Sequence, residues 1–236
     1  NGYKKITKQG FNKIAQQEIS LLEKYKSISE YRNIYHQYSR LHHQHTHARR
    51  GDVKKKFHSV MNPYMPGKKK LPQQANIYLH GAYARYFRTI GDRDKYHEHC
   101  KRVIQIIESS PLQLMERQKQ YLTELFNRII ALGELQRYKE AYGFLHKIRS
   151  IPAKNEHIAI FVFYVSYYVE FEILYTTGQF EKAVKIVSAT EAGLSRFKGK
   201  ISNARYITFC CHIAYSYFGT GNYSNVIEWS NKVINN

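Results

Sequence analysis

The sequence has little of several residue types that mark common protein classes. Its three Cys, at positions 100, 210 and 211, are too few and too oddly placed for a disulfide scaffold, which indicates a reducing, cytoplasmic location. Five Pro and 13 Gly among 236 residues leave room for long uninterrupted helices. No run of about 18 apolar residues occurs, so no membrane span is expected. The longest such stretch, 158–168, is too short and is followed by Glu170 and Glu172.

Recognisable catalytic motifs are also absent. The chain has no nucleophile elbow, Walker loop, dinucleotide-binding glycine pattern or paired-carboxylate motif. Acidic residues are scarce, with 18 Asp and Glu against 37 Lys and Arg. The sequence therefore predicts a protein that is not an enzyme, with no catalytic residues and no cofactor.

What is present is a repeat of about 42 residues. Four segments each open with a short polar turn followed by an aromatic residue, and the aromatics are 42, 42 and 43 residues apart: Tyr96, Tyr138, Phe180 and Tyr223. A mostly small residue comes three positions later, and a breaker about 15 positions later, at Pro111, Pro152 and Gly193. Such regular spacing indicates one structural unit copied along the chain.

Each unit reads as two amphipathic helices. Apolar residues recur at helical spacing before each aromatic, in 121–132, 158–175 and 204–218, and again after it. A helix pair of this kind cannot bury both faces alone, so neighbouring pairs must stack. The predicted fold is all-α: a right-handed α-solenoid of stacked antiparallel helix pairs, with about four to five repeats.

The pattern resembles the tetratricopeptide repeat family. The resemblance rests on a turn Gly, an aromatic two residues on and a small residue three further, best seen in 178–183 and 221–226. The period near 42 exceeds the family's 34, and the 133–138 turn reads as stretched. HEAT-like pairs have a closer period but lack a matching internal Pro or Asp pattern.

The N-terminal third reads as a separate helical element. Phe11, Ile14, Ile19, Leu21 and Leu22 form one amphipathic run, and a Ser at 27 or 29 could cap a second helix beginning near residue 30. A short helix is expected at 53–61. The predicted organisation is a basic, His-rich element or divergent first repeat at 1–61, a Pro/Lys loop at 62–76 and the repeats at 77–236. Residues 1–60 either complete the superhelix or fold across it. We also expect the chain to be part of a larger protein.

Positive charge is concentrated near the N-terminus, because residues 1–110 hold 22 of the 37 Lys and Arg. A candidate polyanion-binding patch consists of Arg49, Arg50, Lys54, Lys55, Lys56, Lys68, Lys69 and Lys70. A solvated basic surface explains the same residues. The run His42–His47 places imidazoles at helical spacing, but a zinc site needs further ligands and no metal site is predicted. Cys210 and Cys211 cannot form a CxxC redox pair and are expected in the core.

In the tetratricopeptide family, the first helices of successive units line a groove that holds a peptide or partner helix. By resemblance, the groove residues here are Arg85, Arg88, Tyr168, Glu172, Tyr175 and Tyr215. These tyrosines could equally pack between repeats. The favoured function is a non-enzymatic interaction module or scaffold for a protein or peptide, and the alternative is a helical protein that binds nucleic acid or another polyanion through 49–70. The oligomeric state stays open.

Overall fold

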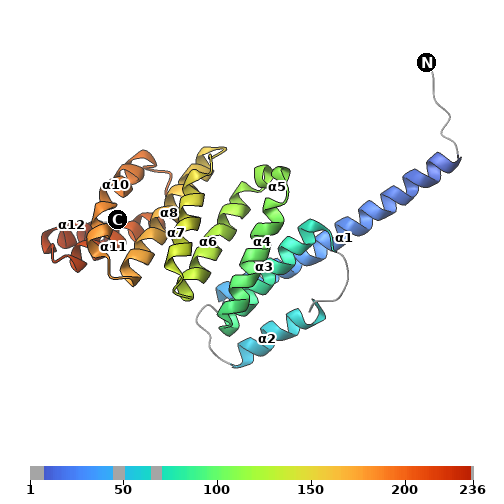
Figure 1. Cartoon of the computed structure of the whole chain (residues 1–236), viewed down its shortest axis with the longest axis horizontal. Helices are drawn as coiled ribbons and strands as arrows, with labels where there is room; N and C mark the ends of the chain where they lie inside the picture. Colours follow the sequence, from blue (N-terminus) through green and yellow to red (C-terminus); the bar gives the residue numbers. More distant parts are fainter. Residues whose placement is uncertain (1–7, 45–50, 65–70, 235–236) are drawn as a thin grey trace, which may run out of the picture. The chain divides into compact units, whose positions relative to one another are not determined.

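The computed structural model describes residues 8–44, 51–64 and 71–234, and within these ranges it contains helices and no strands (Figure 1). The predicted all-α class is confirmed. In chain order the elements are α1 (Lys8–Gln44), α2 (Gly51–Met61), η1 (Asn62–Tyr64), α3 (Gln73–Ile90), α4 (Arg93–Glu108), α5 (Pro111–Glu116), α6 (Gln118–Glu134), α7 (Tyr138–Ser150), α8 (Glu156–Thr176), α9 (Phe180–Lys185), α10 (Val187–Arg196), α11 (Asn203–Gly219) and α12 (Tyr223–Ile234). The chain divides into two compact units, residues 1–110 and 111–236.

The first unit is built on α3, which packs against both α1 and α4. The close approach of α1 requires a glycine: a Cβ on Gly81 would lie 2.8 Å from the ring of Tyr35. Tyr38 of α1 is fully buried, and its hydroxyl donates to the carbonyl of Phe57 in α2. The loop predicted at 62–76 needs correction, because residues 62–64 form η1 and α3 begins at Gln73, while 65–70 lie outside the described residues.

The helix α1 differs from the expectation. It runs unbroken for 37 residues, so the predicted second helix near residue 30 is wrong. Nothing between residues 11 and 44 breaks a helix, because no Pro or Gly occurs there, and Ser27 and Ser29 lie within it. The apolar side chains of the N-terminal run are 52–67% exposed, since α3 has 18 residues and covers only the second half of α1.

The second unit consists of helix pairs that pack on their neighbours. The helix α8 contacts α6, α7, α9 and α11, and α11 contacts α9, α10 and α12 as well. One apolar cluster runs through α8 to α12 and includes Phe163, Phe171, Phe209, Ile213 and Trp229. The helices predicted from the apolar stripes at 121–132, 158–175 and 204–218 are confirmed as α6, α8 and α11.

The same turn closes four helices, one in the first unit and three in the second. The turn residue adopts a left-handed conformation, its amide bonds to the carbonyl three residues back, and the next amide bonds to the carbonyl five back. These residues are Gly91, Gln136, Gly178 and Gly221, with φ values of 84°, 59°, 68° and 74°. The aromatic follows two residues later at Tyr138, Phe180 and Tyr223.

Two details of the predicted repeat need correction. The stretched turn at 133–138 is regular, because α6 continues through Gly133 and Gln136 takes the left-handed position. The proposed breaker Gly193 lies inside α10 rather than ending a helix. It permits close packing instead, since a Cβ there would lie 1.9 Å from the ring of Phe163 on α8.

Among the described residues, α8 is the helix that is long and apolar enough to cross a membrane. Its best 18-residue window has a mean hydropathy of 1.5, although no uninterrupted apolar run of that length exists. Half of this window is buried within the fold. A core helix passes the same test, so this finding is weak evidence for a span.

Candidate partner-binding site

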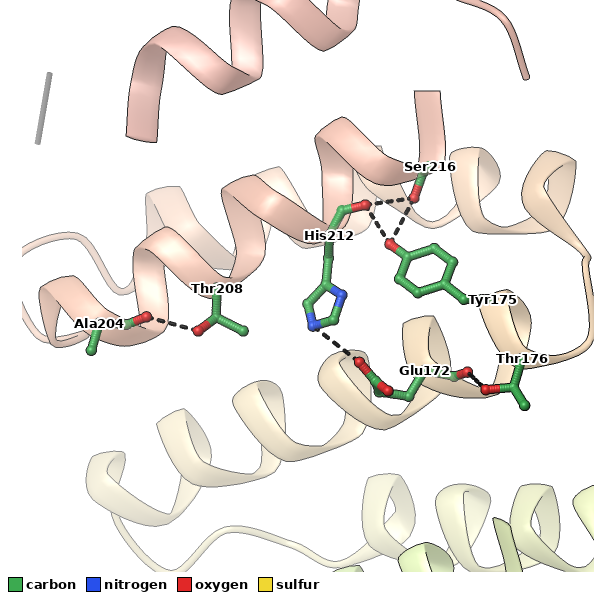
Figure 2. Close-up of polar contacts among 7 residues, drawn as sticks. All are labelled: Glu172, Tyr175, Thr176, Ala204, Thr208, His212 and Ser216. Carbon is green, nitrogen blue, oxygen red and sulfur yellow. Dashed lines mark hydrogen bonds and ion pairs between the residues drawn. The ribbon is translucent and has the colours of Figure 1, made fainter. Parts of the chain in front are cut away.

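Four of the predicted groove residues lie on two neighbouring helices of the second unit. Tyr168, Glu172 and Tyr175 follow one another at steps of four and three residues, which places them on one face of α8. Tyr215 lies on α11, which packs against α8. His212, one turn before Tyr215, faces Glu172 across the two helices (Figure 2).

Packing and hydrogen bonds fix the position of His212. Its ring stacks on Phe171 with 5.4 Å between centroids, and the ring of Tyr168 meets it edge-on at 5.3 Å. The hydroxyls of Tyr175 and Ser216 both donate to the backbone carbonyl of His212, as Figure 2 shows. The hydroxyl of Tyr175 therefore joins α8 to α11.

Burial sets the charges of Glu172 and His212. The His212 side chain is 11% exposed, and burial lowers the pKa of its imidazole to about 4, so it is neutral at pH 7. The Glu172 side chain is 47% exposed, and partial burial raises the pKa of its carboxyl above the ordinary value. Its exposed half keeps the carboxylate ionised at neutral pH.

These two groups do not neutralise each other at pH 7. The distance from Glu172 Oε1 to His212 Nε2 is 3.8 Å, which is too long for a hydrogen bond, and His212 Nε2 has no hydrogen-bond partner among the described residues. No Lys or Arg of the described ranges forms an ion pair with Glu172, whereas Glu170, two residues earlier, pairs with Arg149. Glu172 thus carries an uncompensated negative charge on a chain of net charge +19.

An apolar cleft of about 170 Å³ opens beside Glu172, between α6 and α8. Ile129 and Ile130 line it from α6, and Val169 and Ile173 line it from α8. Glu134 adds a second carboxyl at the end of α6. The cleft therefore combines aliphatic walls with acidic groups.

Aromatic rings extend this surface across three helices. The ring centroid of Tyr168 lies 6.1 Å from that of Phe126 on α6, and Tyr168 stacks on Tyr164 with 5.7 Å between ring centroids. Tyr215, 48% exposed, meets Tyr175 edge-on at 4.9 Å. The guanidinium of Arg205 lies 4.6 Å from the centre of the Tyr164 ring, so one of these rings makes a cation–π contact within the fold.

The two predicted groove arginines belong to the first unit. Arg85 is half-buried against α1: its guanidinium lies 4.1 Å from the centre of the Tyr35 ring and donates to the Tyr35 hydroxyl at 2.6 Å. Arg88 is exposed, with its guanidinium 5.5 Å from the ring of Tyr96. Arg85 is thus engaged in packing α1 onto α3.

Most of the predicted polyanion patch lies outside the described residues: Arg49, Arg50, Lys68, Lys69 and Lys70. Lys54 lies in α2, and Lys55 and Lys56 are exposed on that helix. Half of the His run, 45–47, also lies outside the described ranges, in which no group of three metal-binding side chains occurs. Cys210 is buried as expected, but Cys211 is exposed because adjacent helical residues point about 100° apart.

Sequence reasoning missed His212. The available signal was a polar residue within the apolar stripe of 204–218, with Thr208 and Ser216 four residues away on either side. That spacing marks a polar line along α11 but does not reveal what the line faces.

No protein-family model matches the chain, and no curated protein or solved structure matches it either.

Proposed function

We propose that this chain is a non-enzymatic interaction module that binds a peptide or a partner helix. Its helix pairs would form a tetratricopeptide-like right-handed solenoid, with α6, α8 and α11 as the first helices that line the groove. The observation that carries the proposal is the convergence of Tyr168, Glu172 and Tyr215 on one surface of α8 and α11. Partly exposed tyrosines on a rigid helical surface are typical of interface hot spots.

The hydrogen bonding around His212 favours binding over catalysis. A catalytic hydroxyl is usually held against the base that activates it. Here the hydroxyls of Tyr175 and Ser216 donate to the backbone carbonyl of His212 rather than to its ring.

Selection from a random dodecapeptide library, using the full chain as bait, tests this proposal. We expect peptides that bind saturably and whose affinity falls about tenfold or more in Tyr168→Ala and Tyr215→Ala, measured by calorimetry. Tyr25→Ala removes an exposed tyrosine from α1, away from the proposed site, and serves as the control. Circular dichroism must show that the variants keep their helices. Failure to recover peptides, or equal binding by all three variants, would reject the proposed site.

The polyanion alternative is separated by fluorescence anisotropy with single-stranded RNA. Binding that falls steeply with salt and is unaffected by Tyr168→Ala would favour the basic region instead.

A further inference from the structure

We infer that the partner anchors itself with a cationic side chain, Lys or Arg, whose aliphatic stem fills the cleft between α6 and α8 and whose charged group pairs with Glu172. This inference rests on the proposed function and specifies the chemistry of its partner. It depends on three features of the second unit: an unmatched charge, an apolar cleft beside it and the surrounding rings.

The unmatched charge makes a cation the favoured ligand. Glu172 is about half removed from water, yet no described Lys or Arg pairs with it and the neighbouring imidazole is neutral. A partly desolvated carboxylate gains free energy when a cation replaces the water it has lost. An anionic ligand, such as a phosphate or an acidic peptide, would be repelled at the same point.

The unbonded imidazole nitrogen favours a ligand that donates hydrogen bonds. His212 Nε2 is an acceptor when its proton resides on Nδ1, and it lies 3.8 Å from Glu172 Oε1. One ammonium or guanidinium group placed beside both atoms can donate to each of them. A hydrogen-bond acceptor at this position would leave both atoms without a donor.

The cleft has the form that a long basic side chain needs. Its walls are the aliphatic side chains of Ile129, Ile130, Val169 and Ile173, and its carboxyls come from Glu134 and Glu172. Lys and Arg bury their methylene stems along apolar surface while their charged ends meet polar groups. An uncharged apolar residue would fill the cleft but leave Glu172 unpaired.

The tyrosine rings add to the preference for a cation. Aromatic faces attract ammonium and guanidinium groups, and Arg205 already occupies such a position over Tyr164. Tyr168 and Tyr175 lie one turn before and after Glu172, so a cation held at Glu172 is flanked by both residues.

The composition of the selected peptides tests the inference. Peptides recovered by the full chain should carry Lys or Arg at one fixed position, and Glu172→Gln should recover peptides without that enrichment. A synthetic peptide with citrulline or norleucine at the anchor should bind the wild-type chain about tenfold or more weakly. The same exchange should have little effect on Glu172→Gln, because its partner charge is already gone. Glu181→Gln, which removes an exposed carboxylate from α9, should behave like the wild type.

The outcomes separate this inference from the proposed function. Peptides that bind at Tyr168 and Tyr215 without a basic anchor would overturn the inference and leave the proposed function standing. If no peptide is recovered, both fail. Affinity that disappears in EDTA would show that a bridging metal ion, rather than a basic side chain, occupies the site. Because Gln has the shape of Glu and the position is half-exposed, Glu172→Gln should keep the wild-type melting temperature.

Discussion

Burial changes how readily two side chains on α8 and α11 bind a proton. His212 loses the proton that a solvent-exposed imidazole shares near pH 6.5, and Glu172 holds its proton more tightly than an exposed carboxyl does. Residue type alone would suggest an ion pair between them in weak acid. The structure instead leaves one negative charge at neutral pH.

Peptide binding should weaken in mild acid. Because its pKa is raised, the Glu172 carboxylate takes up a proton at a higher pH than an exposed carboxylate does, so affinity for a basic peptide should fall as the pH decreases through mild acid. The facing titratable groups are His212, which stays neutral until about pH 4, and Glu134. Calorimetry at several pH values measures the change. Glu172→Gln should give a flatter profile, and an identical profile would contradict this assignment.

The hydroxyl of Tyr175 should contribute to stability rather than to binding. Tyr175→Phe removes a partly buried hydrogen bond to the His212 carbonyl, and we expect it to lower the free energy of unfolding by about 1 kcal/mol. Ser216 still donates to that carbonyl, which limits the loss. Tyr215→Phe removes the hydroxyl from an exposed ring and should have no measurable effect in the same urea titration.

At the scale of elements, glycine has two different roles. Gly193 lies where α10 meets Phe163, so adding a methyl group forces that ring to move. Gly143 lies exposed within α7 with open space around its Cα.

Alanine at these two glycines should have opposite effects. Gly193→Ala should destabilise the fold by about 1–3 kcal/mol through overpacking. Gly143→Ala should stabilise it by about 0.5–1 kcal/mol, because alanine restricts the unfolded chain and favours a helix. Urea unfolding of both variants checks the prediction, and equal effects would show that α10 does not approach Phe163 as described.

An imidazole pair joins α3 to α4 and should make the first unit sensitive to acid. His80 Nδ1 and His99 Nδ1 are 2.9 Å apart, and the ring of Phe87 stacks on His99. Burial lowers the pKa of both rings, and that of His99 falls to about 4. The positive charges of Arg102 and Lys95 add to the shift at His99, and the negative charge of Asp92 opposes it. The unfolded chain therefore binds more protons below pH 6.5 than the folded chain does.

This difference predicts that the contribution of the two neutral imidazoles to stability is fully present above about pH 6.5. That contribution is lost as the pH falls toward 4. We expect the thermal midpoint of the transition that unfolds α3 and α4 to drop by about 5 °C or more between pH 7 and pH 5. His99→Phe keeps the stacking and should show a smaller drop. His146→Gln, a change at an exposed histidine of α7, should retain the wild-type dependence.

At the scale of the whole molecule, the chain divides between residues 110 and 111. The second unit has its own apolar cluster, with Phe171, Phe209 and Ile213 fully buried. A unit with its own core can fold alone.

Residues 111–236 expressed without the first unit should fold cooperatively and bind the selected peptides with the affinity of the full chain. Circular dichroism with thermal unfolding and calorimetry test this. A fragment that lacks helical signal would show that the first unit is needed for folding. A folded fragment that binds weakly would show that the first unit contributes to the site.

Local features of the sequence determined the helices and their order. Apolar periodicity located α6, α8 and α11, and the glycines at 91, 178 and 221 marked the turns that end α3, α8 and α11. Both signals act over a few neighbouring residues. The tertiary structure decided the burial that the sequence left open. It exposes half of α1, separates the environments of Cys210 and Cys211, and places His212 against Glu172. These outcomes depend on which helices meet, and 40 residues separate Glu172 from His212, so local periodicity contains no information about their contact.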